Sequence, residues 1–296
     1  MYKLILLIII FTLVFAFLKA GSLHAPLKSF SGWKIERDTS LPEPLKDVVK
    51  ITRSWEFPST LKNVSGIDYL EPDRIACIQD EVGSIFIYNL ESKSIETEIP
   101  FGPPGDYEGI ALVNDNAYVA CADGRIYEIL NYRSDKPVVK EYGTHLTVKQ
   151  NVEGLCLDHK NNRLLVAIKG IDEGNRNYKG VYAFDLLSKA MPVKPVLKID
   201  LKDSVFNNLQ PKNRQMIFQP SDIDIQPVTQ DIYIADGTRS QLLVMGESGN
   251  IKDLHNLNKT IFVQPEGITF TPSGELYIAS KGVKEEPGML MLVQFK

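Results

Sequence analysis

The stretch GDYEGIAL, residues 105–112, places Glu108 directly before a glycine and a short apolar run. The same arrangement returns in NVEGLCL (151–157) and QPEGITF (264–270), and with serine instead of glutamate in NVSGIDY (63–69) and QPSDIDI (219–225). We call the five equivalent positions anchors: Ser65, Glu108, Glu153, Ser221 and Glu266. Successive anchors lie 43, 45, 68 and 45 residues apart, which indicates a chain built from repeats.

Each repeat has the same plan. An apolar strand follows the anchor, and a polar turn leads to a second strand, such as AYVACA (117–122). A third strand comes next, as in RIYEIL (125–130), and a more polar fourth strand closes most repeats, as in SIETEIPF (94–101). Four strands in about 45 residues are typical of a β-propeller blade. The sequence therefore predicts an all-β fold, a β-propeller of five four-stranded blades, or six if residues 29–58 hold further strands.

The last repeat ends at Lys296 after only three strands. We expect KITRSWEFP (50–58) to supply its outer strand, because pairing the two ends of the chain removes open sheet edges. The interval of 68 residues is too short for two repeats. We assign its excess to two loops, residues 171–180 and 202–216.

The charge and the cysteine content of the chain argue against some classes of protein. The 296-residue chain has a net charge of −4 and scattered basic residues, which argues against a nucleic-acid-binding surface. Three cysteines, Cys77, Cys121 and Cys156, stand within apolar runs. This placement predicts small buried side chains rather than disulfides or metal ligands.

Residues 1–28 differ from the rest of the chain. Lys3 precedes 15 residues without a charge (4–18), a pattern typical of a signal peptide or of an N-terminal membrane anchor. Residues 29–49 predict a linker, and residues 50–296 the propeller. We therefore expect a cell-envelope protein: an extracytoplasmic propeller anchored in the plasma (inner) membrane, or a periplasmic or secreted one if the leader is cleaved.

The anchors are the first candidate site. The first strand of a blade is the innermost, so the residue that leads it lies near the central channel. Carboxylates of Glu108, Glu153 and Glu266 around one narrow axis would repel one another unless protons, hydrogen-bond donors or a cation neutralise them. Oxygen ligands of this kind suit Ca²⁺ best. The alternative is that the anchors accept backbone hydrogen bonds and join one blade to the next.

A second group of charged residues is expected at the same mouth of the channel. Most follow the second strand of a blade, and one precedes an anchor by two residues; together they could bind a small ligand or neutralise the glutamates. The members are Asp80, Asp106, Asp123, Lys169, Asp236 and Lys281.

The ordered set NVSGIDY, IQDEVGSIFIY, GDYEGIAL, NVEGLCL, QPSDIDI and QPEGITFTPSGELYIAS resembles the SdiA-regulated (YjiK/CarP-like) β-propeller family. The resemblance covers about residues 50–296. It implies a location in the bacterial cell envelope and a link to Ca²⁺, with the acidic anchors falling on Glu108, Glu153 and Glu266. It transfers no catalytic residues. This chain departs from the pattern at two serine anchors and at Asp222, which replaces a glycine.

Three functions follow as hypotheses. The first is a non-enzymatic propeller that binds Ca²⁺ or a small ligand in its axial channel. The second is a metal-dependent hydrolase, a lactonase or a phytase-like phosphoesterase, in which a metal polarises the substrate; neither GxSxG nor HExxH is present. The third is a scaffold that contacts an envelope protein partner through the loops 171–180 and 202–216. We favour the first.

Overall fold

The computed structural model of the chain describes residues 48–172, 174–209 and 213–296. The expected leader and nearly all of the expected linker lie outside these residues. Among the described residues, no helix is both long and apolar enough to cross a membrane.

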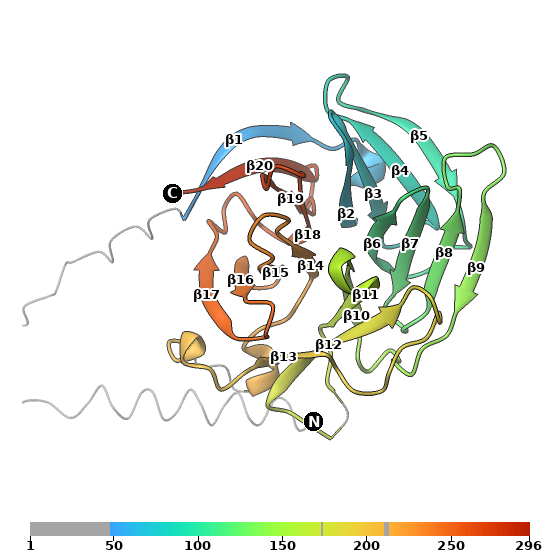
Figure 1. Cartoon of the computed structure of the whole chain (residues 1–296). Coiled ribbons are helices and arrows are strands. Elements are labelled where there is room, and N and C mark those ends of the chain that lie inside the picture. Colours follow the sequence, from blue (N-terminus) through green and yellow to red (C-terminus); the bar gives the residue numbers. More distant parts are fainter. Residues whose placement is uncertain (1–47, 173, 210–212) are drawn as a thin grey trace, which may run out of the picture. The chain divides into compact units, whose positions relative to one another are not determined.

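Five antiparallel sheets of four strands each stand around a common axis (Figure 1). Blade 1 comprises β2 (Val64–Glu71), β3 (Arg74–Gln79), β4 (Ser84–Asn89) and β5 (Ser94–Pro100). Blade 2 comprises β6 (Tyr107–Val113), β7 (Asn116–Cys121), β8 (Ile126–Leu130) and β9 (Val138–Tyr142). Blade 3 comprises β10 (Val152–Asp158), β11 (Arg163–Ile168), β12 (Tyr178–Asp185) and β13 (Leu197–Asp200). Blade 4 comprises β14 (Asp222–Ile225), β15 (Ile232–Asp236), β16 (Gln241–Met245) and β17 (Ile251–Asn256).

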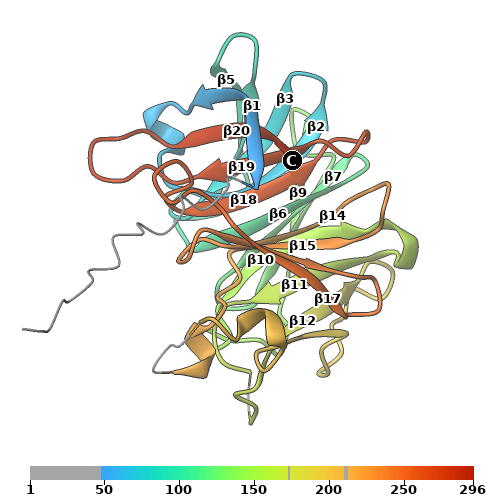
Figure 2. The ribbon, with the colours of Figure 1, turned by 90° about the vertical axis from the view of Figure 1, so that its left-hand side faces the viewer.

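Blade 5 is built from both ends of the described chain. It comprises β18 (Pro265–Phe270), β19 (Leu276–Ser280), β20 (Met289–Phe295) and, as its outer strand, β1 (Val49–Glu56). Figure 2 shows β1 beside β20, and the antiparallel register runs from Val49 opposite Phe295 to Glu56 opposite Met289. The predicted closure is confirmed, and so is the count of five blades. The alternative of six is wrong, because the described part of the segment before β2, residues 48–63, supplies a single strand to blade 5.

The hydrophobic core consists of five clusters, each lying between two neighbouring blades within the described residues. This follows from the alternation of side chains along a strand, which gives each blade two apolar faces. Trp55 on β1 is buried in the cluster between blades 5 and 1, and its indole Nε1 donates a hydrogen bond to the carbonyl oxygen of Leu90 at 2.8 Å. The closing strand is thereby fixed to the first blade as well as to the last.

The loops between the strands contain short 3₁₀ helices. These are η1 (Ser59–Leu61), η2 (His159–Asn161), η3 (Ser204–Phe206) and η4 (Arg214–Met216). The loop predicted at 171–180 is shorter than expected, because its residues from Tyr178 onward already pair with β13 as part of β12. Cys77, Cys121 and Cys156 are buried free thiols, as predicted.

Candidate functional site

The inner strands β2, β6, β10, β14 and β18 contact one another in this order around the axis. In four of them the strand begins with a β-bulge, and the extra residue of each bulge is the anchor: Ser65, Glu108, Glu153 and Glu266. A bulge turns one side chain out of the regular alternation. This local geometry directs the anchor differently from its neighbours along the strand.

The glycine after the anchor is required by close packing. A Cβ atom on Gly109 would lie 2.7 Å from the backbone nitrogen of Leu155, and one on Gly154 would lie 2.8 Å from that of Ile223. Each glycine therefore lets the inner strand of the next blade pack closely against its own strand. The repeated Glu-Gly pair combines a channel-facing bulge residue with a contact between blades.

The two serine anchors join neighbouring blades. The Ser65 hydroxyl donates a hydrogen bond to the carbonyl oxygen of Tyr107 at 2.6 Å, and the Ser221 hydroxyl donates to that of Pro265 at 2.7 Å. In both cases the acceptor belongs to the following blade. The blade-joining role therefore falls to the serines, whereas the three glutamates are left to form the mouth of the channel.

Six ionisable side chains from four blades meet at this mouth, and we call them the mouth cluster: Asp80, Glu108, Glu153, Lys169, Glu266 and Lys281. Lys169 Nζ lies 3.1 Å from Glu153 Oε1. Lys281 Nζ of blade 5 lies 2.9 Å from Asp80 Oδ2 of blade 1. The side-chain amide of Asn151 also donates to Glu153.

Burial raises the pKa of the three glutamate carboxyl groups of the mouth cluster. Burial, with the nearby charge of Glu153, raises the pKa of Glu108 to about 9 although Lys281 opposes the shift. Burial raises the pKa of Glu153 to about 7, opposed by Lys169, and also raises the pKa of Glu266. At neutral pH the cluster therefore holds at least one protonated carboxyl beside two ammonium groups.

The lysines remain charged despite their burial. Burial alone would lower the pKa of Lys169, but Glu153, Glu266 and Glu108 outweigh it, so the pKa is raised. The pKa of Lys281 is raised in the same way by Glu266 and Asp80. An anionic group that enters this end of the channel would therefore meet two ammonium groups, each already partly paired with carboxylates of the cluster.

A second layer supports the mouth cluster. Asp236 is fully buried and accepts hydrogen bonds from the backbone N–H groups of Gln219 and Arg239, both at 2.9 Å. The residue after it, Gly237, is so close to Glu266 that a Cβ would lie 2.6 Å from Oε1. Lys179, which the sequence did not single out, is buried and donates to the carbonyl oxygens of Lys169 and Gly170. Burial lowers its pKa to about 8.

Three of the predicted residues lie outside the six-residue cluster: Asp236, which belongs to the second layer, Asp106 and Asp123. Asp123 lies in a partly exposed ion pair with Arg125, whose Nε is 2.8 Å from its Oδ2. Asp106 is exposed, and it reaches the cluster only through its charge, which contributes to the raised pKa of Glu108. Spacing alone placed them at the correct end of the blades but could not predict the direction of their side chains.

The mouth cluster was tested for its fit to Ca²⁺. The two serine hydroxyls are turned to the neighbouring blades, and Glu153 is already paired with Lys169 and Asn151. Among the described residues, no group of three or more Asp, Glu, His or Cys side chains is arranged to hold a metal ion. Ca²⁺ prefers six to eight oxygen ligands without cations among them. The donor set fits a charged organic ligand better than a bare cation.

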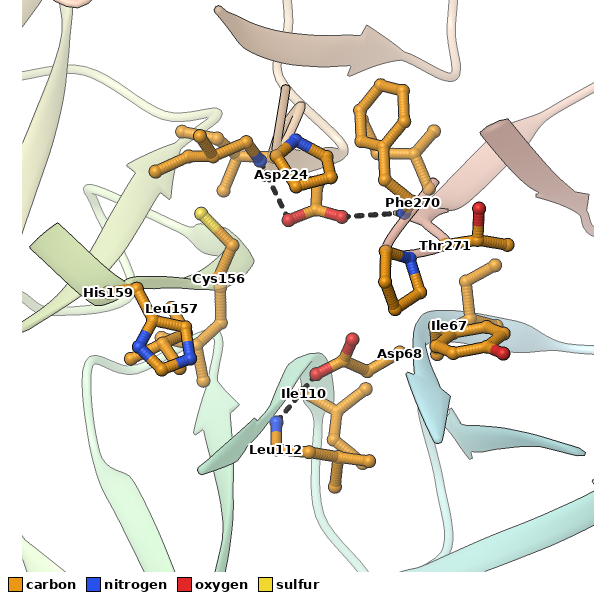
Figure 3. A pocket seen from close by; sticks show the side chains of 17 residues that line it. Ile67, Asp68, Ile110, Leu112, Cys156, Leu157, His159, Asp224, Phe270 and Thr271 are labelled. Carbon is orange, nitrogen blue, oxygen red and sulfur yellow. Dashed lines mark hydrogen bonds between the residues drawn. The ribbon is translucent and has the colours of Figure 1, made fainter. Parts of the chain in front are cut away.

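A different set of carboxylates lies farther along the same inner strands. Asp68 and Asp224, each three residues after a serine anchor, face each other across an axial cavity (Figure 3). Asp68 Oδ2 accepts a hydrogen bond from the backbone N–H of Leu112 at 2.6 Å, and Asp224 Oδ2 accepts one from Phe270 at 2.9 Å. Both donors belong to the following blade, so these side chains satisfy the open edges of inner strands.

The axial cavity has a volume of about 350 Å³ and takes its lining from all five inner strands and the turns that follow them. Polar groups and aliphatic side chains both line it, and one buried residue of each blade contributes to an aliphatic ring: Ile67, Ile110, Leu155, Ile223 and Ile268. Exposed residues His159, Pro227 and Pro272 lie at its outer end. None of the mouth-cluster residues lines it.

Asp68 and Asp224 were not predicted as site residues, although the sequence carries a signal for them. Both occur in an Ile-Asp-aromatic or Ile-Asp-Ile sequence, SGIDY and SDIDI, in the two repeats that lack an anchor glutamate. Comparison of the position three residues after each anchor would have found them. A regular in-out alternation of side chains, without the β-bulge at the anchor, assigns the residues after the bulge to the wrong face of the strand.

Comparison with known proteins supports the fold. No protein-family model and no curated protein matches the sequence. Glutaminyl cyclase from Myxococcus xanthus has a TM-score of 0.57 and 15% identity, covering 86% of this chain and 99% of that one. The PQQ-bound aldose sugar dehydrogenase from Streptomyces coelicolor has a TM-score of 0.53 and 14% identity, covering 86% and 99%. At these identities the likeness extends to the fold alone: the chain is a five-bladed β-propeller.

Proposed function

We propose that this protein is a cell-envelope β-propeller of the SdiA-regulated type that binds a small polar ligand at the mouth cluster without transforming it. One observation supports this most directly. Three buried glutamates and the half-buried Asp80, Lys169 and Lys281 converge from four blades at one end of the axis, at a cost in desolvation that a structural role alone does not require. Ionisable groups of this kind are a common mark of binding sites.

The donors and acceptors of the mouth cluster favour a ligand that carries both an anionic and a hydrogen-bonding or cationic group. Lys169 and Lys281 would receive the anionic group. Within the described residues Glu108 makes no side-chain hydrogen bond, and Asp80 Oδ1 is enclosed without a hydrogen-bond partner. These two oxygen-bearing groups are the natural partners of an ammonium or hydroxyl group on the same ligand.

Ca²⁺ at this mouth stays a prediction, and the same experiment distinguishes it. We would titrate the full chain by calorimetry with glycine as a small zwitterion, with phosphate and acetate as anions, and with CaCl₂ and MgCl₂. The variants are Glu108→Gln and Lys281→Met. The matched control is Asp123→Asn, an acid at the same end of the blades that lies outside the cluster.

The outcomes distinguish a site for a small polar ligand from a site for a metal cation. The proposal expects glycine or an anion to bind saturably, with at least a tenfold loss in Lys281→Met and unchanged binding in Asp123→Asn. Saturable Ca²⁺ binding that Glu108→Gln abolishes and Lys281→Met strengthens would instead establish a cation site, because the lysine repels a metal ion. If none of the five compounds binds, ligand binding at the mouth is rejected.

A hydrolase is the second candidate, and one observation favours it. Glu153, whose pKa is raised to about 7, lies beside the ammonium group of Lys169, and a carboxyl group with a pKa near the working pH can act as a general acid or base. A screen of lactones and phosphate esters, with and without divalent metals, would test it. Turnover by the wild type that Glu153→Gln abolishes and Asp123→Asn preserves would replace the binding function with catalysis.

A further inference from the structure

The axial cavity is distinct from the mouth cluster in both position and chemistry. Aliphatic side chains from every blade line it together with polar groups, and its two acidic groups, Asp68 and Asp224, point toward one another in Figure 3. Its volume of about 350 Å³ falls in the range of small-molecule pockets, roughly 300–1,000 Å³. It therefore offers a ligand both apolar surface and a strongly polar spot.

The two carboxylates are held in place by the surrounding backbone. Asp68 accepts hydrogen bonds from Leu112 N–H at 2.6 Å and from the Thr269 hydroxyl at 3.2 Å. Asp224 accepts from Ile225 N–H at 2.7 Å and from Phe270 N–H at 2.9 Å. An ionised carboxylate offers about four acceptor positions, so Asp68 and Asp224 each keep positions free for a further donor.

The acidic pair has no partner lysine or arginine within the part of the chain that the structure describes. Among the described residues, neither Asp68 nor Asp224 forms an ion pair with a lysine or arginine, in contrast to Glu153 and Asp80 at the mouth. Both are half-buried and line the cavity. A cation that enters the cavity would thus relieve a repulsion that the fold leaves uncompensated.

We propose that the axial cavity is a second binding site, which takes a small organic ammonium ion with an apolar body. The ammonium group lies between Asp68 and Asp224 and donates to their free lone pairs. The hydrocarbon part packs on the aliphatic ring that includes Ile110 and Leu155. A bare metal ion fits less well, because most of the lining offers no oxygen ligand and the carboxylate oxygens already accept backbone hydrogen bonds.

The test uses the full chain and pairs of probes that share a shape but differ in charge. Calorimetry at pH 8 compares n-butylammonium and benzylammonium chloride with n-butanol and benzyl alcohol. The cavity variants are Asp68→Asn and Asp224→Asn, which keep an oxygen acceptor for the backbone. The matched control is Asp222→Asn: Asp222 also accepts from the next blade, from Ile268 N–H at 2.8 Å, but it does not line the cavity.

The expected result is saturable binding of an ammonium probe, at least tenfold weaker binding of the matching alcohol, and at least tenfold weaker ammonium binding in each cavity variant. Asp222→Asn and the mouth variant Glu108→Gln should retain the wild-type affinity. Thermal melts of each variant without probe establish that it is folded. The inference is overturned if the alcohols bind as tightly as the ammonium ions, if both cavity variants keep full affinity, or if no ammonium probe binds. Because the mouth variant serves as a control, this result is independent of the function proposed above.

Discussion

Asp68 and Asp224 occupy the same repeat position on β2 and β14, three residues after a serine anchor in both blades. The blades with a glutamate anchor carry an uncharged residue at that position: Ala111, Cys156 and Thr269. Every inner strand thus has an acid at one of these two levels, and none has an acid at both. The propeller divides its axial charge between two ends of one channel.

The pair should make ammonium binding depend on pH. Burial raises the pKa of Asp68 to about 6, and burial together with the charge of Asp68 raises that of Asp224 to about 8. Both carboxyls are protonated below these values, and an alkylammonium ion stays charged throughout, since its pKa is roughly 10. We expect the affinity for n-butylammonium to rise about tenfold or more between pH 5.5 and pH 8.5.

Calorimetry at the two pH values checks this expectation. Other titratable groups around the pair belong to several elements: Asp222 on β14, Cys156 on β10, His159 in η2 and Tyr132 after β8. A His159→Gln variant is the control, and it should keep the pH dependence, whereas Asp224→Asn should flatten it. Equal affinity of the wild type at both pH values would contradict the assignment.

Glu108 should destabilise the fold as the pH rises. Its pKa is about 9 in the folded protein and near 4.5 when exposed, so the unfolded chain ionises first. The folded state is therefore favoured most at low pH and loses up to about 1.4 kcal/mol per pH unit between these values. Glu108→Gln removes the titration, and its free energy of unfolding should exceed that of the wild type by a larger margin at pH 8 than at pH 5.

Urea unfolding at both pH values measures that margin. Glu91→Gln changes an exposed glutamate in the turn between β4 and β5 and is the matched control, for which the difference from the wild type should not vary with pH. A margin for Glu108→Gln that stays constant from pH 5 to pH 8 would show that Glu108 is ionised in the folded state.

The glycine after the anchor should not tolerate even one methyl group. In Gly109→Ala the new Cβ would lie 2.7 Å from the backbone nitrogen and the Cβ of Leu155, so an inner strand must shift. We expect a loss of about 1–3 kcal/mol in the free energy of unfolding, as in other overpacked cores. Gly143→Ala is the control, since a Cβ there meets no atom within 4 Å. If urea denaturation shows equal losses of stability for Gly109→Ala and Gly143→Ala, the close packing at Gly109 is refuted.

Removal of Trp55 should weaken the closure of the ring. The indole is 3% exposed, packs on Tyr277 with ring centroids 5.9 Å apart, and donates a hydrogen bond to Leu90. Trp55→Ala should lower the free energy of unfolding by about 3–5 kcal/mol, the usual cost for a large buried aromatic residue. Arg53→Ala, at an exposed position two residues earlier on the same strand, should cost much less. Comparable losses in the two variants would mean that β1 contributes little through its buried face.

Most of the fold could be predicted from the sequence, because strand patterns and anchor spacing repeat along the chain. The closure by residues 50–58 followed from a single missing strand. The site was harder. The bulge at Glu153 and the turn of the Ser65 hydroxyl toward Tyr107 depend on how neighbouring blades meet, and that packing is not encoded in any one repeat.

The lysines illustrate the same limit. Lys169 and Lys281 were expected near the glutamates, and they lie there in the structure. The pairing of Lys281 with Asp80, an acid of another blade, could not be predicted from the sequence. No feature of the sequence predicts that Lys179 is buried beside the mouth cluster, because lysines are rarely buried. Partners that lie far apart along the chain cannot be assigned from spacing.

The pairing of β1 with β20 has a mechanical consequence. Val49 and Phe295 stand opposite each other at one end of this antiparallel pair. A load applied between these two residues would act on that end first and open the strand pair like a zipper, one bridge after another, rather than shearing all bridges together. Under tension the ring would thus open at the seam between β1 and β20, at low force and in small steps.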